Sequence, residues 1–150
     1  MLGMAAMRTL STIGYEGKTL DEFIGELKQA GVALILDVRA VAASRRPGFS
    51  KTALSNALRE NGIDYRHYRA LGTPAAGREA ARKGRTALMR EIYAVQLETP
   101  EAELALERLL GDAGERHAAL LCYEREAAGC HRTMLVERVL EREAFEICNI

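Results

Sequence analysis

Reactive side chains are concentrated near the C-terminal end of the chain, between residues 122 and 132. The candidates in this segment are two thiols, a carboxylate, an imidazole and a guanidinium, in the order Cys122, Glu124, Cys130, His131 and Arg132. The apolar run before it predicts a buried strand, and a helix is predicted to begin at Cys130 or His131. Backbone N–H groups at a helix start attract anions and favour the thiolate of a nearby cysteine. The segment therefore predicts an anion-binding turn with Cys130 as a candidate nucleophile; a cysteine that only packs as a small apolar residue is the alternative.

The same segment also contains zinc-ligand residue types. Cys122, Cys130 and His131 could be joined by His67 or Glu124 as a fourth ligand. However, the spacing lacks the close Cys-x-x-Cys pairing of structural zinc sites, and adjacent Cys and His residues rarely bind one ion. We therefore expect no metal and no cofactor.

Carboxylates are the second group of candidates. Asp37 and Arg39 are two residues apart at the end of an apolar run, so they lie on the same side of an extended chain. They could form a structural ion pair or orient a substrate. Glu16 and Glu124 are candidate general acids or bases, provided that the site is dry enough to change their protonation. The candidate catalytic residues are thus Glu16, Asp37, Glu124 and Cys130.

Positive charge is concentrated in the middle of a chain whose net charge is zero. Residues 39–90 contain twelve Lys and Arg residues but only three Asp and Glu residues. Arginine supplies 17 of the 21 cationic residues, and its planar guanidinium suits bidentate contacts with phosphate. This distribution predicts a phosphate-bearing small molecule or a nucleic acid as partner. The candidate residues for binding it are Tyr15, Arg39, Ser44, Arg45, Arg46, Lys51, Tyr65, His67, His131 and Arg132.

One aromatic residue lies among these cations. Phe49 follows Arg45 and Arg46 and precedes Lys51. Its ring could stack on a nucleic-acid base, or it could pack the loop against the rest of the protein. The sequence leaves both possibilities open.

Alternating strand and helix patterns must position these residues. Strands are predicted over residues 8–13, 32–38, 63–68, 117–123 and 144–148. Helices are predicted to begin after the caps Thr19, Ser50 and Thr99, at Thr86, and at residue 130 or 131, whereas residues 69–84 are predicted to form a long mobile loop. The pattern indicates a three-layer, Rossmann-like α/β fold: a mainly parallel sheet of about four to five strands with helices on both faces. Ligands bind such sheets at the carboxyl ends of the strands, where most of the candidates lie.

Length and composition exclude several classes of protein. The chain of 150 residues is 48% hydrophobic, which is typical of a single globular domain covering residues 1–150. No apolar run is long enough to cross a membrane, and no signal peptide is expected. Three cysteines without a disulfide framework favour a cytoplasmic location. The apolar helix around Leu104 to Leu110 could support a homodimer.

Short motifs follow one another along almost the whole chain. They are Thr12-Ile-Gly14-Tyr15, Leu36-Asp37-Val38-Arg39, Ser44-Arg45-Arg46-Pro47-Gly48-Phe49-Ser50-Lys51, Gly62-Ile63-Asp64-Tyr65, Leu71-Gly72, Leu121-Cys122-Tyr-Glu124 and Cys130-His131-Arg132. Together they resemble the domain of unknown function 488 family, which comprises small bacterial and archaeal proteins. Residues 40–43 lack the proline common in that family after Asp-Val-Arg, and Thr73-Pro74 replaces a frequent second glycine. The resemblance implies a fold and a set of residues rather than a substrate.

The layout is also similar to that of rhodanese-type sulfurtransferases, in which a strand ends in a Cys-x5-Arg anion-binding loop. The position six residues after Cys122 is Ala128, so this chain does not reproduce that loop. Three functions are compatible with the sequence. The first is a hydrolase-type enzyme that acts on a nucleotide or nucleic acid. The second is a non-catalytic nucleic-acid binding module, and the third is a thiol-dependent, rhodanese-like transferase.

Overall fold

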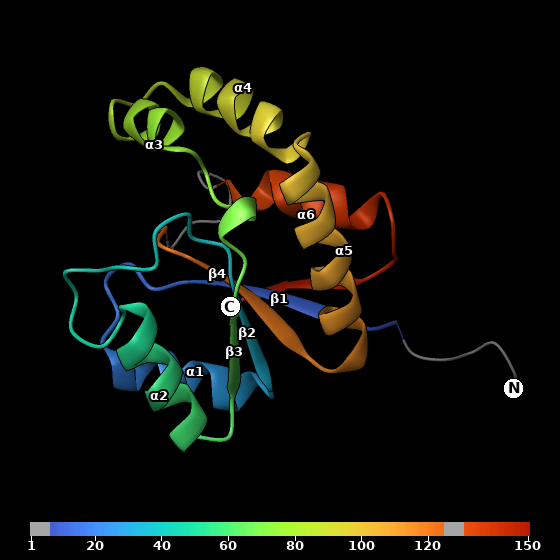
Figure 1. Cartoon of the computed structure of the whole chain (residues 1–150). Helices are drawn as coiled ribbons and strands as arrows, with labels where there is room; N and C mark the ends of the chain where they lie inside the picture. Colours follow the sequence, from blue (N-terminus) through green and yellow to red (C-terminus); the bar gives the residue numbers. More distant parts are fainter. Residues whose placement is uncertain (1–6, 125–130) are drawn as a thin grey trace, which may run out of the picture.

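The computed structural model describes residues 7–124 and 131–150, and these form a three-layer α/β, Rossmann-like fold (Figure 1). In the described residues, the elements are β1 (Thr9–Gly14), α1 (Leu20–Ala30), β2 (Leu34–Asp37), α2 (Lys51–Glu60), β3 (Asp64–His67), a short 3-10 helix (Arg69–Leu71), α3 (Ala75–Arg82), α4 (Thr86–Leu97), α5 (Pro100–Glu115), β4 (Ala118–Cys122), α6 (Arg132–Leu140) and β5 (Glu146–Asn149).

The five strands form one parallel sheet in the order β3-β2-β4-β1-β5. The central strand β4 consists of five buried residues, Ala118 to Cys122, as expected for a strand covered on both faces. Strand β3 alternates between exposed and half-buried residues because it lies at the edge of the sheet. The prediction of a mainly parallel sheet of four to five strands is confirmed.

Helices cover both faces of the sheet. Alternate residues of each strand point to opposite faces, so the apolar residues form two separate cores. Helices α1 and α2 cover the core that contains Ile13, Ile35 and Leu121, whereas α4, α5 and α6 contribute to the core that contains Leu10, Leu36 and Leu120 (Figure 1). Helices α3 and α4 are adjacent and extend beyond the carboxyl end of the sheet (Figure 1).

Side-chain caps mark the start of two helices, α1 and α5. Thr19 and Glu22 form the predicted capping box at α1, and the Thr99 side chain accepts a hydrogen bond from the N–H of Ala102 at α5. Ser50 precedes α2 as predicted, but its side chain does not cap the helix. Its hydroxyl instead accepts a hydrogen bond from the Ser44 N–H at 3.0 Å and donates one to the Ser44 carbonyl.

The prediction of a long mobile loop over residues 69–84 is wrong. A 3-10 helix and α3 occupy most of this segment. The composition concealed α3, because Ala and Arg favour helix formation but supply no apolar stripe. The residues that α3 buries are Gly77 and Ala80, neither of which gives a strong hydrophobic signal.

The region around Leu104 was a candidate dimer surface. Leu106, Leu109 and Leu110 are buried in the core of this chain, whereas Leu104 is exposed. Most of the apolar side chains in that range therefore pack within the chain. Within residues 7–124 and 131–150, no helix combines the length and the apolar character needed to cross a bilayer.

Candidate functional site

The carboxyl ends of β1, β2 and β4 meet at one edge of the sheet and form a wall of a pocket. Tyr15 directly follows β1, Arg39 lies two residues beyond β2, and Tyr123 and Glu124 follow β4. Parallel strands that start at one edge must finish at the other, which brings residues distant in sequence together. The backbone connects these ends directly, since the Glu16 N–H donates to the Tyr123 carbonyl at 2.9 Å.

Asp37 and Arg39 form a buried, bidentate ion pair beneath this wall. The Arg39 Nε and Nη2 atoms donate to the two carboxylate oxygens of Asp37 at 2.9 and 2.7 Å. Asp37 has no exposed surface, and Arg39 is 6% exposed. Burial alone would lower the pKa of the Arg39 guanidinium, but the hydrogen bonds and negative charge of Asp37 outweigh it and raise this pKa. Arg39 therefore stays charged and tightly held.

The remaining contacts of Arg39 fix the surrounding loops. Its Nη1 atom donates to the Phe49 carbonyl at 2.7 Å and approaches the Tyr15 hydroxyl at 3.4 Å. The imidazole Nε2 of His67 donates to the Arg39 carbonyl at 2.6 Å. Most N–H donors of this guanidinium thus have acceptors within the protein. Arg39 lines the pocket, but in this geometry its main role is structural: it connects the residues that follow β1 and β2 to the loop before α2.

Tyr65 completes the buried group of polar residues. Its hydroxyl donates to the Oδ2 atom of Asp37. Burial, together with the nearby charge of Asp37, raises the pKa of the Tyr65 phenol. Tyr65 and His67 therefore support the ion pair from the neighbouring strand, and neither lines the pocket.

The loop before α2 lies beside the pocket and is held by its own contacts. The Ser44 hydroxyl accepts from the Arg46 N–H at 3.1 Å, and Arg46 Nη2 donates to the Lys18 carbonyl. Arg45 and Lys51 are exposed, and none of Ser44, Arg45, Arg46 and Lys51 lines the pocket.

Phe49 packs the loop against the protein and is not available to stack on a base. It is 1% exposed, and its ring stacks on Tyr15 at a centroid distance of 4.5 Å. The Phe23 ring meets it edge to face at 5.3 Å. Of the two alternatives left open by the sequence, the structure therefore has the packing role.

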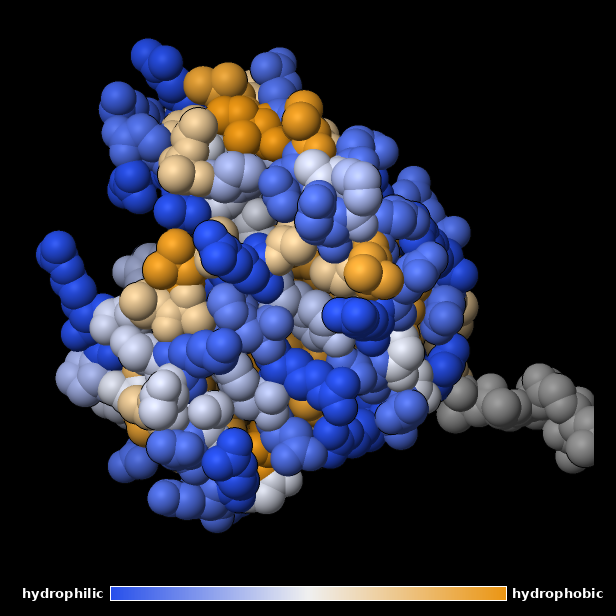
Figure 2. Space-filling model, in the orientation of Figure 1, coloured by the Kyte–Doolittle hydropathy of each residue, from blue (hydrophilic) through white to orange (hydrophobic). Residues whose placement is uncertain are grey.

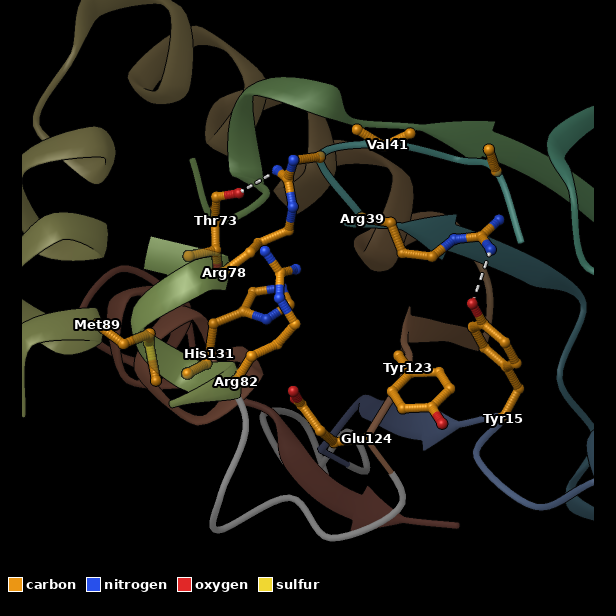
Figure 3. Close-up of a pocket in the computed structure, with 13 residues that line it drawn as sticks. Tyr15, Arg39, Val41, Thr73, Arg78, Arg82, Met89, Tyr123, Glu124 and His131 are labelled. Carbon is orange, nitrogen blue, oxygen red and sulfur yellow. Dashed lines mark hydrogen bonds between the residues drawn. The ribbon is translucent and has the colours of Figure 1, made fainter. Parts of the chain in front are cut away.

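The pocket has a volume of about 420 Å³ and lies between this wall and helix α3 (Figure 3). Arg78, Arg82 and His131 lie on one side of it, and Tyr15 and Tyr123 on the other (Figure 3). The surface is hollowed between α3 and the segment after β2 (Figure 2). The lining residues are Tyr15, Arg39, Ala40, Val41, Ala43, Thr73, Arg78, Ala81, Arg82, Met89, Tyr123, Glu124 and His131.

Helix α3 supplies two cations because Arg78 and Arg82 are four residues apart and share one helix face. The Arg78 Nη1 atom donates to the Thr73 carbonyl at 2.9 Å, and Arg82 pairs with Glu79 on the exposed side of the helix. The hydrogen bond and charge of Arg82 lower the pKa of the exposed Glu79 carboxyl. Both guanidinium groups retain N–H donors for a ligand.

Two glycines allow α3 and the segment before it to pack closely against their neighbours. A Cβ atom on Gly77 would lie 2.5 Å from Thr73 Cγ2, so glycine permits the close packing of α3 against Thr73; Ile92 Cγ2 of α4 would lie 3.3 Å from the same Cβ atom. A Cβ atom on Gly72 would lie 2.2 Å from the Ala40 nitrogen. Gly72 therefore lets the segment before α3 touch the segment after β2, and together these segments close one side of the pocket.

His131 and Glu124 lie in the pocket at the two described ends of the segment between β4 and α6. The His131 Nε2 atom donates to the Val38 carbonyl at 3.3 Å, and the imidazole meets the Tyr93 ring edge to face at 5.1 Å. A histidine held in this way keeps a defined ring orientation.

The other sequence candidates lie outside the pocket. Arg132 is 1% exposed at the first turn of α6, and Glu16 is exposed just after β1. Cys130 lies outside the described residues, and Cys122 is buried in β4 with no exposed surface. In the parts of the chain that the structure describes, no three His, Cys, Asp or Glu residues are grouped closely enough to hold a metal ion.

Sequence reasoning missed nine of the lining residues: the small or apolar Ala40, Val41, Ala43 and Ala81, and five with polar or large side chains, namely Thr73, Arg78, Met89, Arg82 and Tyr123. Four of the latter five lie in or beside α3 and α4, the region whose first half was predicted to be a loop. The spacing of Arg78 and Arg82 was the available signal, because two cations four residues apart in an alanine-rich segment favour one face of a helix.

Comparison with known proteins places the chain in a family. No curated protein and no solved structure matches it. A family model described as "Domain of unknown function DUF488" matches residues 19–139, which include α1 to α5, β2 to β4 and nearly all of α6. This confirms the resemblance seen in the sequence motifs, and the chain belongs to the DUF488 family.

Proposed function

We propose that the pocket binds the phosphate group of a nucleotide-type ligand. The observation that carries this proposal is the pair of arginines, Arg78 and Arg82, that face one pocket from successive turns of α3. Guanidinium groups bind phosphate through paired N–H donors. Among the described residues that line the pocket, Glu124 is the one carboxylate and Arg39, Arg78 and Arg82 are cations, so positive charge prevails there.

The opposite side of the pocket suits the rest of such a ligand. Tyr123 is 48% exposed, and its ring meets the Tyr15 ring edge to face at 5.3 Å. An exposed aromatic face beside bound phosphate offers a stacking surface for a base. Val41 and Met89 add apolar surface, and the volume of about 420 Å³ lies within the range of small-ligand sites.

Glu124 is our candidate for proton transfer. Hydrolysis of a bound phosphate ester would require water to attack phosphorus while a carboxylate accepts the water proton, and the leaving oxygen would take a proton from solvent. The version of the thiol-transfer alternative that uses Cys122 has less support, because Cys122 has no exposed surface; Cys130 lies outside the described residues. The expected catalytic contribution of Asp37 also has little support, because its carboxylate is occupied by Arg39 and Tyr65.

Calorimetric titration with a nucleoside 5′-monophosphate and with the matching nucleoside tests the proposal. The monophosphate should bind the protein more tightly than the nucleoside, and Arg82→Gln should weaken its binding about tenfold by removing charge-assisted hydrogen bonds. Arg90→Gln is the matched control, because Arg90 is an exposed arginine on α4 that does not line the pocket.

Equal affinity for the nucleoside and its monophosphate would contradict the proposal, as would equal effects of the two arginine substitutions. Phosphate release should be measured in the same samples. If the wild-type protein releases phosphate, Glu124→Gln should slow the release while leaving ligand affinity nearly unchanged. An unchanged rate would remove Glu124 from the mechanism.

A further inference from the structure

A second pocket adjoins the first on the other side of the segment after β2. Its volume is about 530 Å³, and it shares Ala40, Val41 and Arg78 with the first pocket. Arg69 and Gln96 are among its other lining residues. Because Arg78 lines both pockets, a ligand that leaves the first pocket past this side chain enters the second.

The second pocket is also cationic. Arg69 is exposed at the start of the 3-10 helix that follows β3, and none of the described residues that line the pocket is acidic. Among the described residues, no carboxylate forms an ion pair with Arg69 or Arg78. The side-chain amide of Gln96 donates to the Ala70 carbonyl at 2.8 Å, which fixes the floor beside Arg69. A guanidinium group that has no carboxylate partner breaks no ion pair when it binds a ligand phosphate.

Resting on the proposed phosphate pocket, we infer that the ligand is a single-stranded oligonucleotide whose successive phosphates occupy the two pockets. A nucleoside monophosphate has a single phosphate, which can occupy only the first pocket and leaves Arg69 without a ligand contact. A phosphodiester chain carries one charge per nucleotide, and a cationic groove that follows its backbone matches this repeat. Arg78 then contacts the chain at the junction, between the Arg82 and Arg69 subsites.

The geometry of the first pocket favours a single strand over a duplex. Its walls are α3 on one side and the residues after β1, β2 and β4 on the other, so a nucleotide must enter with its base unpaired. The half-exposed Tyr123 ring can stack on such a base without reading its sequence. Binding is therefore expected to depend weakly on sequence and strongly on salt.

The test compares thymidine 5′-monophosphate, 5′-phosphorylated dithymidine and a short oligothymidine by calorimetric titration at several salt concentrations. The dinucleotide should bind about tenfold more tightly than the monophosphate because it gains a charge-assisted contact. Arg69→Gln should remove most of this gain and lower the salt slope by about 1, while monophosphate affinity changes less than about twofold. Arg90→Gln is the control and should change none of these values by more than about twofold.

Each outcome decides between the two proposals. If the monophosphate binds in an Arg82-dependent way but the dinucleotide binds no more tightly, the second subsite is refuted and the first pocket stands. The subsite is equally refuted if Arg69→Gln weakens both ligands alike. If none of the three ligands binds at low salt, both proposals fail. The oligothymidine is also titrated after annealing to its complementary strand; if this duplex binds as tightly as the single strand, the single-strand assignment is wrong.

Discussion

Replacing Asp37 by Asn removes the negative charge that faces the buried Arg39 guanidinium. The carboxylate accepts hydrogen bonds from the Arg39 N–H at 3.1 Å, from Nε at 2.9 Å and from Nη2 at 2.7 Å, as well as from the Tyr65 hydroxyl. Asn offers one acceptor oxygen, and its amide donors would face other donors. We expect Asp37→Asn to lower the free energy of unfolding by about 3–5 kcal/mol, the usual cost of leaving a buried charge without its partner.

Urea unfolding at about pH 7, followed by circular dichroism, measures this loss. Asp64→Asn is a matched control, because Asp64 pairs with Arg116 at 2.6 Å but their side chains are 57% and 38% exposed. Solvent screens that pair, so the control should lose less than about 1 kcal/mol. The reasoning is refuted if both substitutions cost the same. The double variant Asp37→Asn/Arg39→Gln should lose less than the sum of its single variants, because it leaves no buried charge.

Three further outcomes are expected. Burial and Asp37 raise the pKa of Tyr65, and burial with a hydrogen bond to Asp112 raises that of Tyr68 to about 12. The folded protein therefore keeps phenol protons that the unfolded chain releases above about pH 10, so the free energy of unfolding falls as the pH rises there. Tyr65→Phe should make this fall less steep, as measured by urea unfolding at about pH 10 to 11. Gly72→Ala should lower the melting temperature strongly, because its Cβ would lie 2.2 Å from the Ala40 nitrogen. Gly111→Ala, where no atom lies within 4 Å of the added Cβ, should raise stability by roughly 0.4–1 kcal/mol in the same thermal scans.

The elements that sequence reasoning could predict are those with strong hydrophobic periodicity or distinctive caps. Helix α1 has the Thr19 capping box and an apolar stripe, and the buried run of β4 is nearly continuous. Helix α3 has neither a side-chain cap nor large apolar residues, and the residues that it buries are the small Gly77 and Ala80. Its position depends on close backbone approach to α4, which is a tertiary property and leaves little trace in local sequence.

The location of the site could be predicted from the sequence, but the contacts of its side chains could not. Topology alone brings the carboxyl ends of parallel strands to one edge, so Tyr15, Arg39 and Glu124 could be assigned to a common location before the structure was known. Which of their polar atoms face a ligand depends on side-chain contacts. Arg39 lines the pocket, but Asp37 and the Phe49 carbonyl take up most of its N–H donors.

The buried ion pair determines which charges a ligand in the pocket would meet. Asp37 and Arg39 neutralise each other at 2.7 Å, so their combined field in the pocket is weak. Arg78 bonds to a neutral carbonyl, and the Glu79 that pairs with Arg82 is exposed, so solvent screens this competition. Anion binding would then depend on α3, whose place is set by Gly77 against Thr73 and Ile92. Gly77→Ala should therefore weaken nucleotide binding in the calorimetric titration even though Gly77 does not line the pocket, whereas substitutions at Arg45, which is also outside the pocket, should not.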